Sequence, residues 1–258
     1  MNLTNETKSK RKEVIAFSIF ITHIKRIGIF RTFIGGGFMY LSIVEFVFIH
    51  LTAIVVLYQW MLTPFFKVKK FAVKDYIHLD RGRIDGMTFF DKFNCHFCAY
   101  ANGSVKLWND QLDEISIADL GKGRYTGKLI VLMFSLCMMA FLVFNFIFSK
   151  VLFGIISLFL GYHRVGSKEI KSRLETENYA GSYIAPLRGI IRFAKLYARI
   201  LSLNLEQIES NWCPLKHIET STSVFPEHHQ NFYDRNNLKG ALKALGSEGS
   251  VSPRKLKY

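Results

Sequence analysis

Hydrophobic residues gather in two long stretches of the chain instead of following a short, regular alternation. The clearer stretch covers residues 38–61, with Tyr40 near its beginning and Tyr58 and Trp60 near its end. As a helix with ~1.5 Å of rise per residue it would be about 36 Å long, enough to cross a hydrocarbon core of ~30 Å with some tilt. Tyrosine and tryptophan are typical of membrane interfaces. The pattern therefore predicts a transmembrane helix over residues 38–61.

The second stretch, residues 129–162, has a length that fits neither one span nor two. A single helix over it would measure about 51 Å, well beyond one bilayer, whereas two full spans and a turn need roughly 42 residues or more. Ser149 and Lys150 divide the stretch into a longer and a shorter part. We expect one span followed by a short re-entrant or interfacial piece, or a tight hairpin.

The N-terminal region is basic before it becomes apolar. Residues 1–12 predict a solvated tail. Residues 14–34 mix Ile and Phe with three cations, too many for a span, and predict an interfacial helix. The glycines at 35–37 predict a hinge that leads into the membrane. Because cations interrupt the apolar residues and no small-residue cleavage site follows, we expect no cleavable signal peptide.

The polar regions predict shorter elements. Residues 71–79 roughly alternate and are rich in β-branched and aromatic side chains, which predicts one or two short strands. Apolar residues at helical spacing predict a helix over residues 103–120, and another that begins at Pro186 and ends near residue 211. From about residue 220 the low hydrophobicity predicts a flexible tail.

A basic stripe lies on the second of these predicted helices. Its members repeat at intervals of four and three residues: Arg188, Arg192, Lys195 and Arg199. Such a stripe is usually a solvated face, and next to a membrane it can also contact lipid phosphates. These four residues are therefore candidate lipid-phosphate contacts.

The net charge of the chain bears on which partner it binds. The chain carries 34 Lys and Arg against 20 Asp and Glu, a formal net charge of +14. In a soluble protein this excess would favour nucleic acid. Next to apolar stretches of this length, it is better explained by anionic headgroups and by the Lys and Arg that cytoplasmic loops carry. We expect a lipid bilayer with anionic headgroups as partner and no nucleic acid. A protein partner or a second copy of the chain stays open.

Two motifs could hold a metal ion. Cys95 and Cys98 are separated by two residues, so a tight turn can direct both sulfurs at one ion, as in the knuckles of structural zinc sites. Cys213 and His217 follow the end of a predicted helix and can supply the other two ligands. Cys₃His closes a tetrahedral zinc site without an open position. Cys137 lies in the second apolar stretch, and we expect its side chain to be buried there as a small hydrophobic group.

The sequence therefore predicts zinc held by Cys95, Cys98, Cys213 and His217. Three alternatives stay open: an iron–sulfur cluster, a redox-active pair of Cys95 and Cys98, and plain burial of these side chains.

The same residues carry a resemblance to a known group of proteins. The two blocks are Asn94-Cys95-x-x-Cys98-x-Tyr100-Ala101-Asn102-Gly103 and Trp212-Cys213-Pro214-Leu215-Lys216-His217. Together they resemble the paired N-C-x-x-C-x-Y-A-N-G and W-C-P-[IL]-K-H blocks of a group of uncharacterised bacterial membrane proteins. The resemblance implies a bacterial membrane location and no particular activity. It also favours one shared site for the two motifs.

Two polar side chains, Glu45 and His50, interrupt the first apolar stretch. Each is costly in contact with lipid, so both should face protein or water. The simpler interpretation is a hydrogen bond to a neighbouring helix, and the other is contact with an ion or a substrate.

These observations predict a mainly α-helical integral membrane protein with one clear transmembrane helix, a second apolar run and a small metal-knuckle region. Because both polar regions are rich in Lys and Arg, we expect a bacterial inner (cytoplasmic) membrane protein whose soluble regions face the cytoplasm. The expected organisation is a basic tail and interfacial helix (1–37), a transmembrane helix (38–61), a region with the C-x-x-C knuckle (62–128), a second membrane segment (129–162), a basic helix with the C-P-x-x-x-H motif (163–219) and a flexible tail (220–258).

Function is less constrained than location. If residues 129–162 crossed the membrane once, the two cysteine motifs would lie on opposite sides, so a shared site requires this run to return to the same face. No nucleophile elbow, H-E-x-x-H motif or complete P-loop occurs, and we name no catalytic residue. We expect a metal-stabilised membrane scaffold that recruits a partner. The alternative is a membrane-bound redox or lipid- or quinone-acting enzyme that uses an iron–sulfur or dithiol centre, and a small transporter is a weaker third option.

Overall fold

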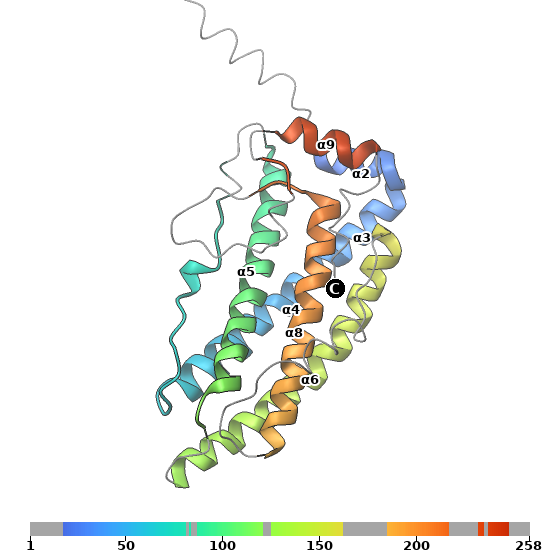
Figure 1. Ribbon diagram of the computed structural model, residues 1–258. Coiled ribbons are helices and arrows are strands. Elements are labelled where there is room, and N and C mark those ends of the chain that lie inside the picture. Colours follow the sequence, from blue (N-terminus) through green and yellow to red (C-terminus); the bar gives the residue numbers. More distant parts are fainter. Residues whose placement is uncertain are drawn as a thin grey trace, which may run out of the picture.

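The computed structural model describes residues 18–80, 83, 87–120, 125–161, 185–216, 232–234 and 237–247. This described part is mostly helical, and it contains no strand (Figure 1). Its elements are α2 (Ser18–Ile27), α3 (Ile29–Leu41), α4 (Ile43–Phe48), η1 (Ile49–Leu62), η2 (Val73–Asp75), α5 (Phe89–Ile117), α6 (Tyr125–Leu160), α8 (Ala185–Trp212) and α9 (Leu238–Ser247). The predicted tail over residues 1–12 and the candidate ligand His217 lie outside the described residues.

The first apolar helix is longer than its sequence pattern predicts. α3, α4 and the π-helical η1 follow one another without a break, so the helix covers 34 residues, Ile29–Leu62. The helix predicted over residues 38–61 is confirmed. The break before it lies at Gly28, where φ is +88°, a conformation that glycine adopts without a Cβ penalty.

The hinge predicted at residues 35–37 is wrong, because all three glycines lie inside α3. A Cβ at Gly35 would come within 2.5 Å of Leu160 Cδ2, and a Cβ at Gly36 would lie 3.4 Å from the Trp212 ring. These two glycines therefore allow α3 to approach α6 and the end of α8 closely. Glycine serves here for packing and not for bending.

The second apolar run forms one continuous helix of 36 residues, α6. The predicted division at Ser149 and Lys150 is therefore wrong, and neither a re-entrant piece nor a hairpin forms. Ser149 is buried in the bundle, next to Glu45, while Lys150 is exposed. A serine that faces a polar neighbour on another helix is tolerated in a helix interior.

α5 begins well before the predicted helix over residues 103–120. Thr88 caps it: the Thr88 hydroxyl accepts a hydrogen bond from the Asp91 backbone N–H at 3.2 Å, and the Asp91 carboxylate accepts one from the Thr88 N–H at 3.3 Å. This capping box satisfies two backbone donors that would otherwise have no partner at the helix start.

The prediction of one or two short strands over residues 71–79 is wrong, because no strand forms there.

After η1 the chain returns along α5 through residues 63–80, which we call the return segment (Figure 1). Apart from the single turn of η2, its backbone is irregular. The Lys69 backbone N–H donates to Glu114 Oε1 at 3.0 Å, and the Tyr76 hydroxyl donates to Asp110 Oδ2 at 2.9 Å. Phe71, Val73 and Tyr76 are partly buried, with exposed Ala72 and Lys74 between them. The alternation that predicted a strand thus comes from a segment packed with one side on a helix.

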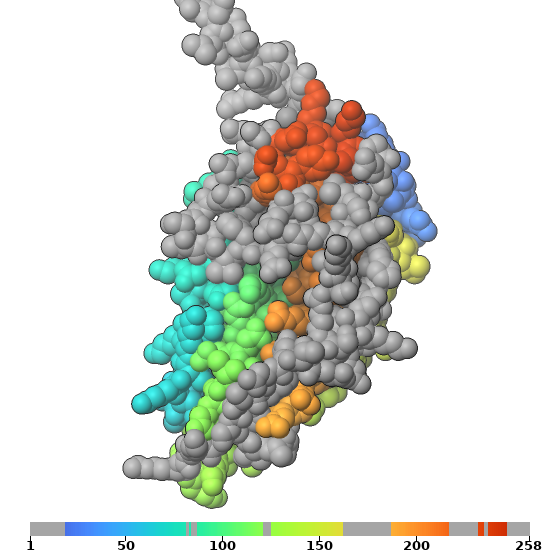
Figure 2. All heavy atoms as spheres, in the orientation of Figure 1, coloured from blue at the N-terminus to red at the C-terminus, as the bar shows by residue number. Residues whose placement is uncertain are grey.

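The predictions for the last two described helices had opposite outcomes. The helix predicted to begin at Pro186 is confirmed as α8, which begins one residue earlier. The flexible tail predicted from residue 220 is wrong in part, because α9 is a helix that packs against α2 at one end of the bundle (Figures 1 and 2).

The long helices form two antiparallel pairs. In the apolar pair, the helix Ile29–Leu62 runs against α6, with Gly35 close to Leu160 and Phe48 beside Phe141. In the polar pair, α5 runs against α8. Across the pairs the directions are parallel: the first apolar helix follows α5, with Tyr40 next to Phe97 and His50 next to Tyr100, and α6 follows α8.

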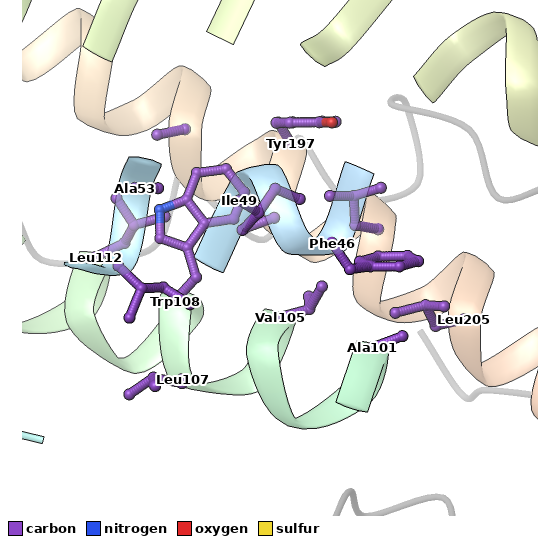
Figure 3. Close-up of a cluster of buried hydrophobic side chains, with 14 of the residues drawn as sticks. Phe46, Ile49, Ala53, Ala101, Val105, Leu107, Trp108, Leu112, Tyr197 and Leu205 are labelled. Carbon is purple, nitrogen blue, oxygen red and sulfur yellow. The ribbon is translucent and has the colours of Figure 1, made fainter. Parts of the chain in front are cut away.

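The core lies where the four long helices meet (Figure 3). Trp108 of α5 is 1% exposed and packs edge-on against Phe141 of α6 and Tyr197 of α8. Phe46 and Ile49 contribute to this cluster from the first apolar helix. The apolar and polar pairs are thus held together by aromatic packing, which buries large areas per side chain.

Candidate functional site

Cys95 and Cys98 lie in the interior of α5 and not in a turn. The predicted knuckle is therefore absent as a local structure. Residues three apart on a helix share a face, so both sulfurs still point to the same side. The two side chains are 1% and 3% exposed, and the Cys95 thiol lies 3.9 Å from Met87 Sδ. The C-x-x-C motif is a buried feature of a helix.

Cys213 follows the last residue of α8. Its backbone N–H donates to the Glu209 carbonyl at 2.9 Å, so the helical hydrogen bonding continues to this residue, and Pro214 then ends it. The Cys213 side chain is 2% exposed. A short bridge between Leu215 and Tyr233 fixes the chain just beyond it.

The polar pair brings the two cysteine motifs to the same end of the bundle. Asn102 Nδ2 donates to Glu209 Oε2 at 2.9 Å across α5 and α8. Cys98 lies one turn before Asn102, and Cys213 lies one turn after Glu209. Because the helices are antiparallel, Cys98 and Cys213 lie at the same level of the pair. We call this end, where α5 begins and α8 ends, the cysteine end.

Several buried or partly buried polar side chains surround the cysteines, and the sequence analysis gave none of them a role in the site. The Tyr40 hydroxyl donates to Asn94 Oδ1, and Asn102 Nδ2 also donates to the Cys98 carbonyl at 3.1 Å. Glu209 is fully buried. The available signal was the spacing: Asn102 lies four residues after Cys98, and Glu209 four before Cys213, so each shares a helical face with a cysteine.

The described residues do not form a metal site by themselves. No three His, Cys, Asp or Glu side chains in this part of the chain gather closely enough to hold an ion. No disulfide joins Cys95, Cys98 or Cys213. The fourth candidate ligand, His217, begins a stretch that the structure does not describe.

Glu45 faces protein, as expected for a carboxyl group in an apolar helix. It is 2% exposed, and its Oε1 accepts a hydrogen bond of 2.6 Å from the Tyr197 hydroxyl. His50 is partly buried, with its Nδ1 3.2 Å from the Tyr100 hydroxyl and its ring stacked on that tyrosine. Both contacts cross to a neighbouring helix of the polar pair, as the simpler interpretation expects.

The basic stripe on α8 divides into two parts. Arg188 and Arg192 are exposed, whereas Lys195 is 4% exposed and lies 3.0 Å from Asp113 Oδ1. The Arg199 guanidinium lies 3.2 Å from the other oxygen of Asp113. Lys195 and Arg199 therefore have a protein partner in α5.

The same ion pairs line an open cleft of about 490 Å³ between α5, α8 and the return segment, far from the cysteine end. Its lining includes Lys69, Tyr76, Asp113 and Glu114. The mixed charges pair with one another, so the cleft offers no surplus of either sign.

His23 of α2 is a further buried group at the cysteine end. Its ring stacks on Trp212 with centroids 4.2 Å apart, and its Nε2 lies 3.2 Å from the Trp212 carbonyl oxygen. The pKa of His23 is lowered from 6.5 to about 4, mainly by burial and also by the nearby Arg26 charge, while the Trp212 carbonyl opposes the shift. His23 is therefore neutral at pH 7.

We expect the His23 environment to make stability depend on pH. Between pH 6.5 and about 4 the unfolded chain binds a proton at His23 that the folded chain does not bind. The free energy of unfolding therefore falls as the pH is lowered through this window. His23→Gln, which can still donate to the carbonyl, should lose less stability than wild type between pH 7 and pH 5 in denaturant titrations. Equal losses in both proteins would contradict this assignment.

Comparison with known proteins adds no assignment to these features. No family model, no curated protein and no solved structure matches the chain.

Proposed function

We propose that the protein is a membrane-anchored helical scaffold whose cysteine end is closed by a metal ion, zinc by preference, held by Cys95, Cys98, Cys213 and His217. Two helices long and apolar enough to cross a membrane support the anchor. The soluble face of the bundle would recruit a partner at the cytoplasmic side of a bacterial inner membrane. This location rests on the basic charge of the polar regions and on the resemblance of the two cysteine blocks.

The observation that carries the proposal is the hydrogen bond between Asn102 and Glu209. It fixes the register of α5 and α8 so that Cys98 and Cys213 occupy the same level. The sequence alone left the two motifs on opposite sides of a membrane if α6 crossed it once. With both motifs at one end of the bundle, a shared ligand set requires no reversal within α6.

Completing the set requires His217 and a closer approach of Cys213 to the two thiols of α5. Metal ions commonly organise their ligands as they bind, since the free energy of binding is also free energy of folding. A bound zinc ion would link the start of α5 to the chain after α8 and so close this end of the bundle. Four protein ligands leave no open position for a substrate, which favours a structural role.

The position of the cysteines argues against a redox carrier. Thiols become reactive when a helix N-terminus or a cation lowers their pKa and when solvent reaches them. Cys95 and Cys98 lie inside α5, beyond its first turn, and both are nearly fully buried. An iron–sulfur cluster with a redox or enzymatic role is the alternative that uses the same ligands.

The test is the metal content of protein purified in mild detergent, for wild type, Cys95→Ser, Cys213→Ser and Cys137→Ser. We expect zinc equimolar with the chain in wild type and in Cys137→Ser. Cys137 is exposed on α6, so its predicted burial is wrong, and it belongs to neither motif. Cys95→Ser and Cys213→Ser should each lose the ion.

Each other outcome overturns part of the proposal. Wild-type protein without zinc or iron would remove the metal site. Loss of metal in Cys95→Ser but not in Cys213→Ser would show that the motifs do not share a site. Iron with visible absorbance that bleaches on reduction would replace the zinc scaffold by the redox alternative.

A further inference from the structure

The apolar pair turns a hydrophobic surface outward along its whole length. Among the described residues, most of the exposed large hydrophobic side chains lie on these two helices. Examples are Phe30 (67% exposed) near one end and Trp60 (67%) at the other, with Phe144 and Ile147 (both 61%) on α6 between them. Soluble monomers rarely expose apolar patches of this extent.

The polar pair covers the other side of the bundle. α5 and α8 reach the surface on the face shown in Figure 2. Arg188 and Arg192 of α8 are exposed. The exposed lysines of the return segment, among them Lys67, Lys69, Lys70 and Lys74, lie along α5. The polar and apolar sides thus run parallel to the bundle axis instead of forming a band across it.

The direction of the helices makes a crossing of the membrane difficult. The first apolar helix and α5 are consecutive long helices and yet parallel, so the chain between them must run back along the bundle. The return segment does this as irregular backbone, from Lys69 beside Glu114 to Tyr76, whose carbonyl oxygen lies against Gly103. Irregular, lysine-rich backbone does not occur in contact with lipid within the hydrocarbon region.

The second half of the molecule repeats this topology. α6 and α8 are also consecutive and parallel, with Phe146 next to both Phe193 and Tyr197. The end of α6 and the start of α8 therefore lie at opposite ends of the bundle, and the sequence between them contains Arg164, Lys168 and Glu169. If the apolar pair crossed a bilayer, these two helix ends would lie on opposite sides of it, as would the end of the first apolar helix and the start of α5.

Length and charge point to the same orientation. At ~1.5 Å per residue, α6 is about 54 Å long, far more than a ~30 Å hydrocarbon core requires, and the first apolar helix has 34 residues where roughly 20 suffice for a span. Glu45, which is buried, is the single acidic residue in the two helices. Their exposed charges are the cations Arg31, Lys128 and Lys150, which match anionic headgroups.

We propose that the apolar pair lies in the plane of the membrane, embedded in one leaflet, with the polar pair and the return segment in water on the same side. The occupant of the apolar face is therefore the lipid surface, and neither apolar helix crosses the bilayer. This inference rests on the membrane anchor of the proposed function and is independent of the metal ion.

The test compares the sides of the membrane on which two positions lie. Lys25→Cys, before the first apolar helix, and Lys70→Cys, after it, are made in a Cys137→Ser background. Both lysines are exposed, whereas Cys95, Cys98 and Cys213 are buried. Each variant is treated with a membrane-impermeant maleimide in intact bacterial spheroplasts and again after lysis. The Cys137→Ser parent measures the background.

An in-plane orientation gives both positions the same reactivity: both protected in intact spheroplasts and both labelled after lysis. Labelling of one position in intact spheroplasts and protection of the other overturns the in-plane orientation and leaves the membrane anchor intact. Recovery of the protein as a soluble dimer without detergent assigns the apolar face to a second copy and overturns both the orientation and the anchor.

Discussion

Replacing Trp108 by alanine is expected to lower the free energy of unfolding by about 3–5 kcal/mol, the usual cost of removing a large aromatic side chain from a core. Trp108 is 1% exposed and lies between Phe141 and Tyr197, with ring centroids 5.6 and 5.7 Å away. Alanine would leave a cavity at the point where α5 contacts α6 and α8. Denaturant titration in mild detergent, followed by circular dichroism, measures the change.

Trp60→Ala provides the matched control for this substitution. It removes the same side chain from η1, but Trp60 is 67% exposed. We expect its free energy of unfolding in detergent to stay within about 0.5 kcal/mol of wild type, as for most surface substitutions. If both variants lost equal stability, Trp108 would not be the central contact between the apolar and polar pairs.

The confirmed helices share one property: enough apolar residues recur at helical spacing, or follow one another, to predict a helix from hydrophobicity. α8 has an apolar seam and begins next to Pro186, and its extent was predicted within about two residues, the usual uncertainty of a helix boundary. The first apolar helix was found for the same reason. Both helices also bury polar side chains, such as Glu45 and Glu209, but these do not interrupt the apolar pattern enough to hide it.

α5 extends beyond its prediction, and its apolar pattern is interrupted by buried amide side chains. Asn94, Asn102, Asn109 and Gln111 are all at most 7% exposed. Polar side chains are stable in such positions when other polar groups satisfy them, as Glu209 of α8 does for Asn102. The partner comes from a distant part of the chain, so the local sequence carries no sign of it.

The candidate site, too, was predicted only in part from the sequence. The sequence identified Cys95, Cys98 and Cys213 as chemically distinctive, but it predicted a turn where the structure has a helix. It also left the two motifs on opposite sides of a membrane under one topology. Their common end follows from the antiparallel register of α5 and α8, which depends on long-range contacts that spacing along the chain does not encode.

Gly103→Ala is expected to destabilise the protein by about 1–3 kcal/mol, the usual cost of overpacking. A Cβ at Gly103 would lie 2.4 Å from the Tyr76 carbonyl oxygen and 3.0 Å from Ile77 Cα, which are backbone atoms that can move only if the return segment leaves α5. Gly103 therefore permits the close approach that brings the chain back along the bundle.

Gly189→Ala in α8 is the same kind of substitution, but we expect it to raise the free energy of unfolding instead of lowering it. A Cβ there meets no other atom within 4 Å, so the higher helix propensity of alanine should stabilise the protein by up to about 1 kcal/mol. Denaturant titration of both variants measures the difference, and limited proteolysis within residues 63–80 reports whether the return segment has separated from α5. A stabilised Gly103→Ala would mean that this segment does not rest on α5, and the main topological reason for the in-plane orientation would then be lost.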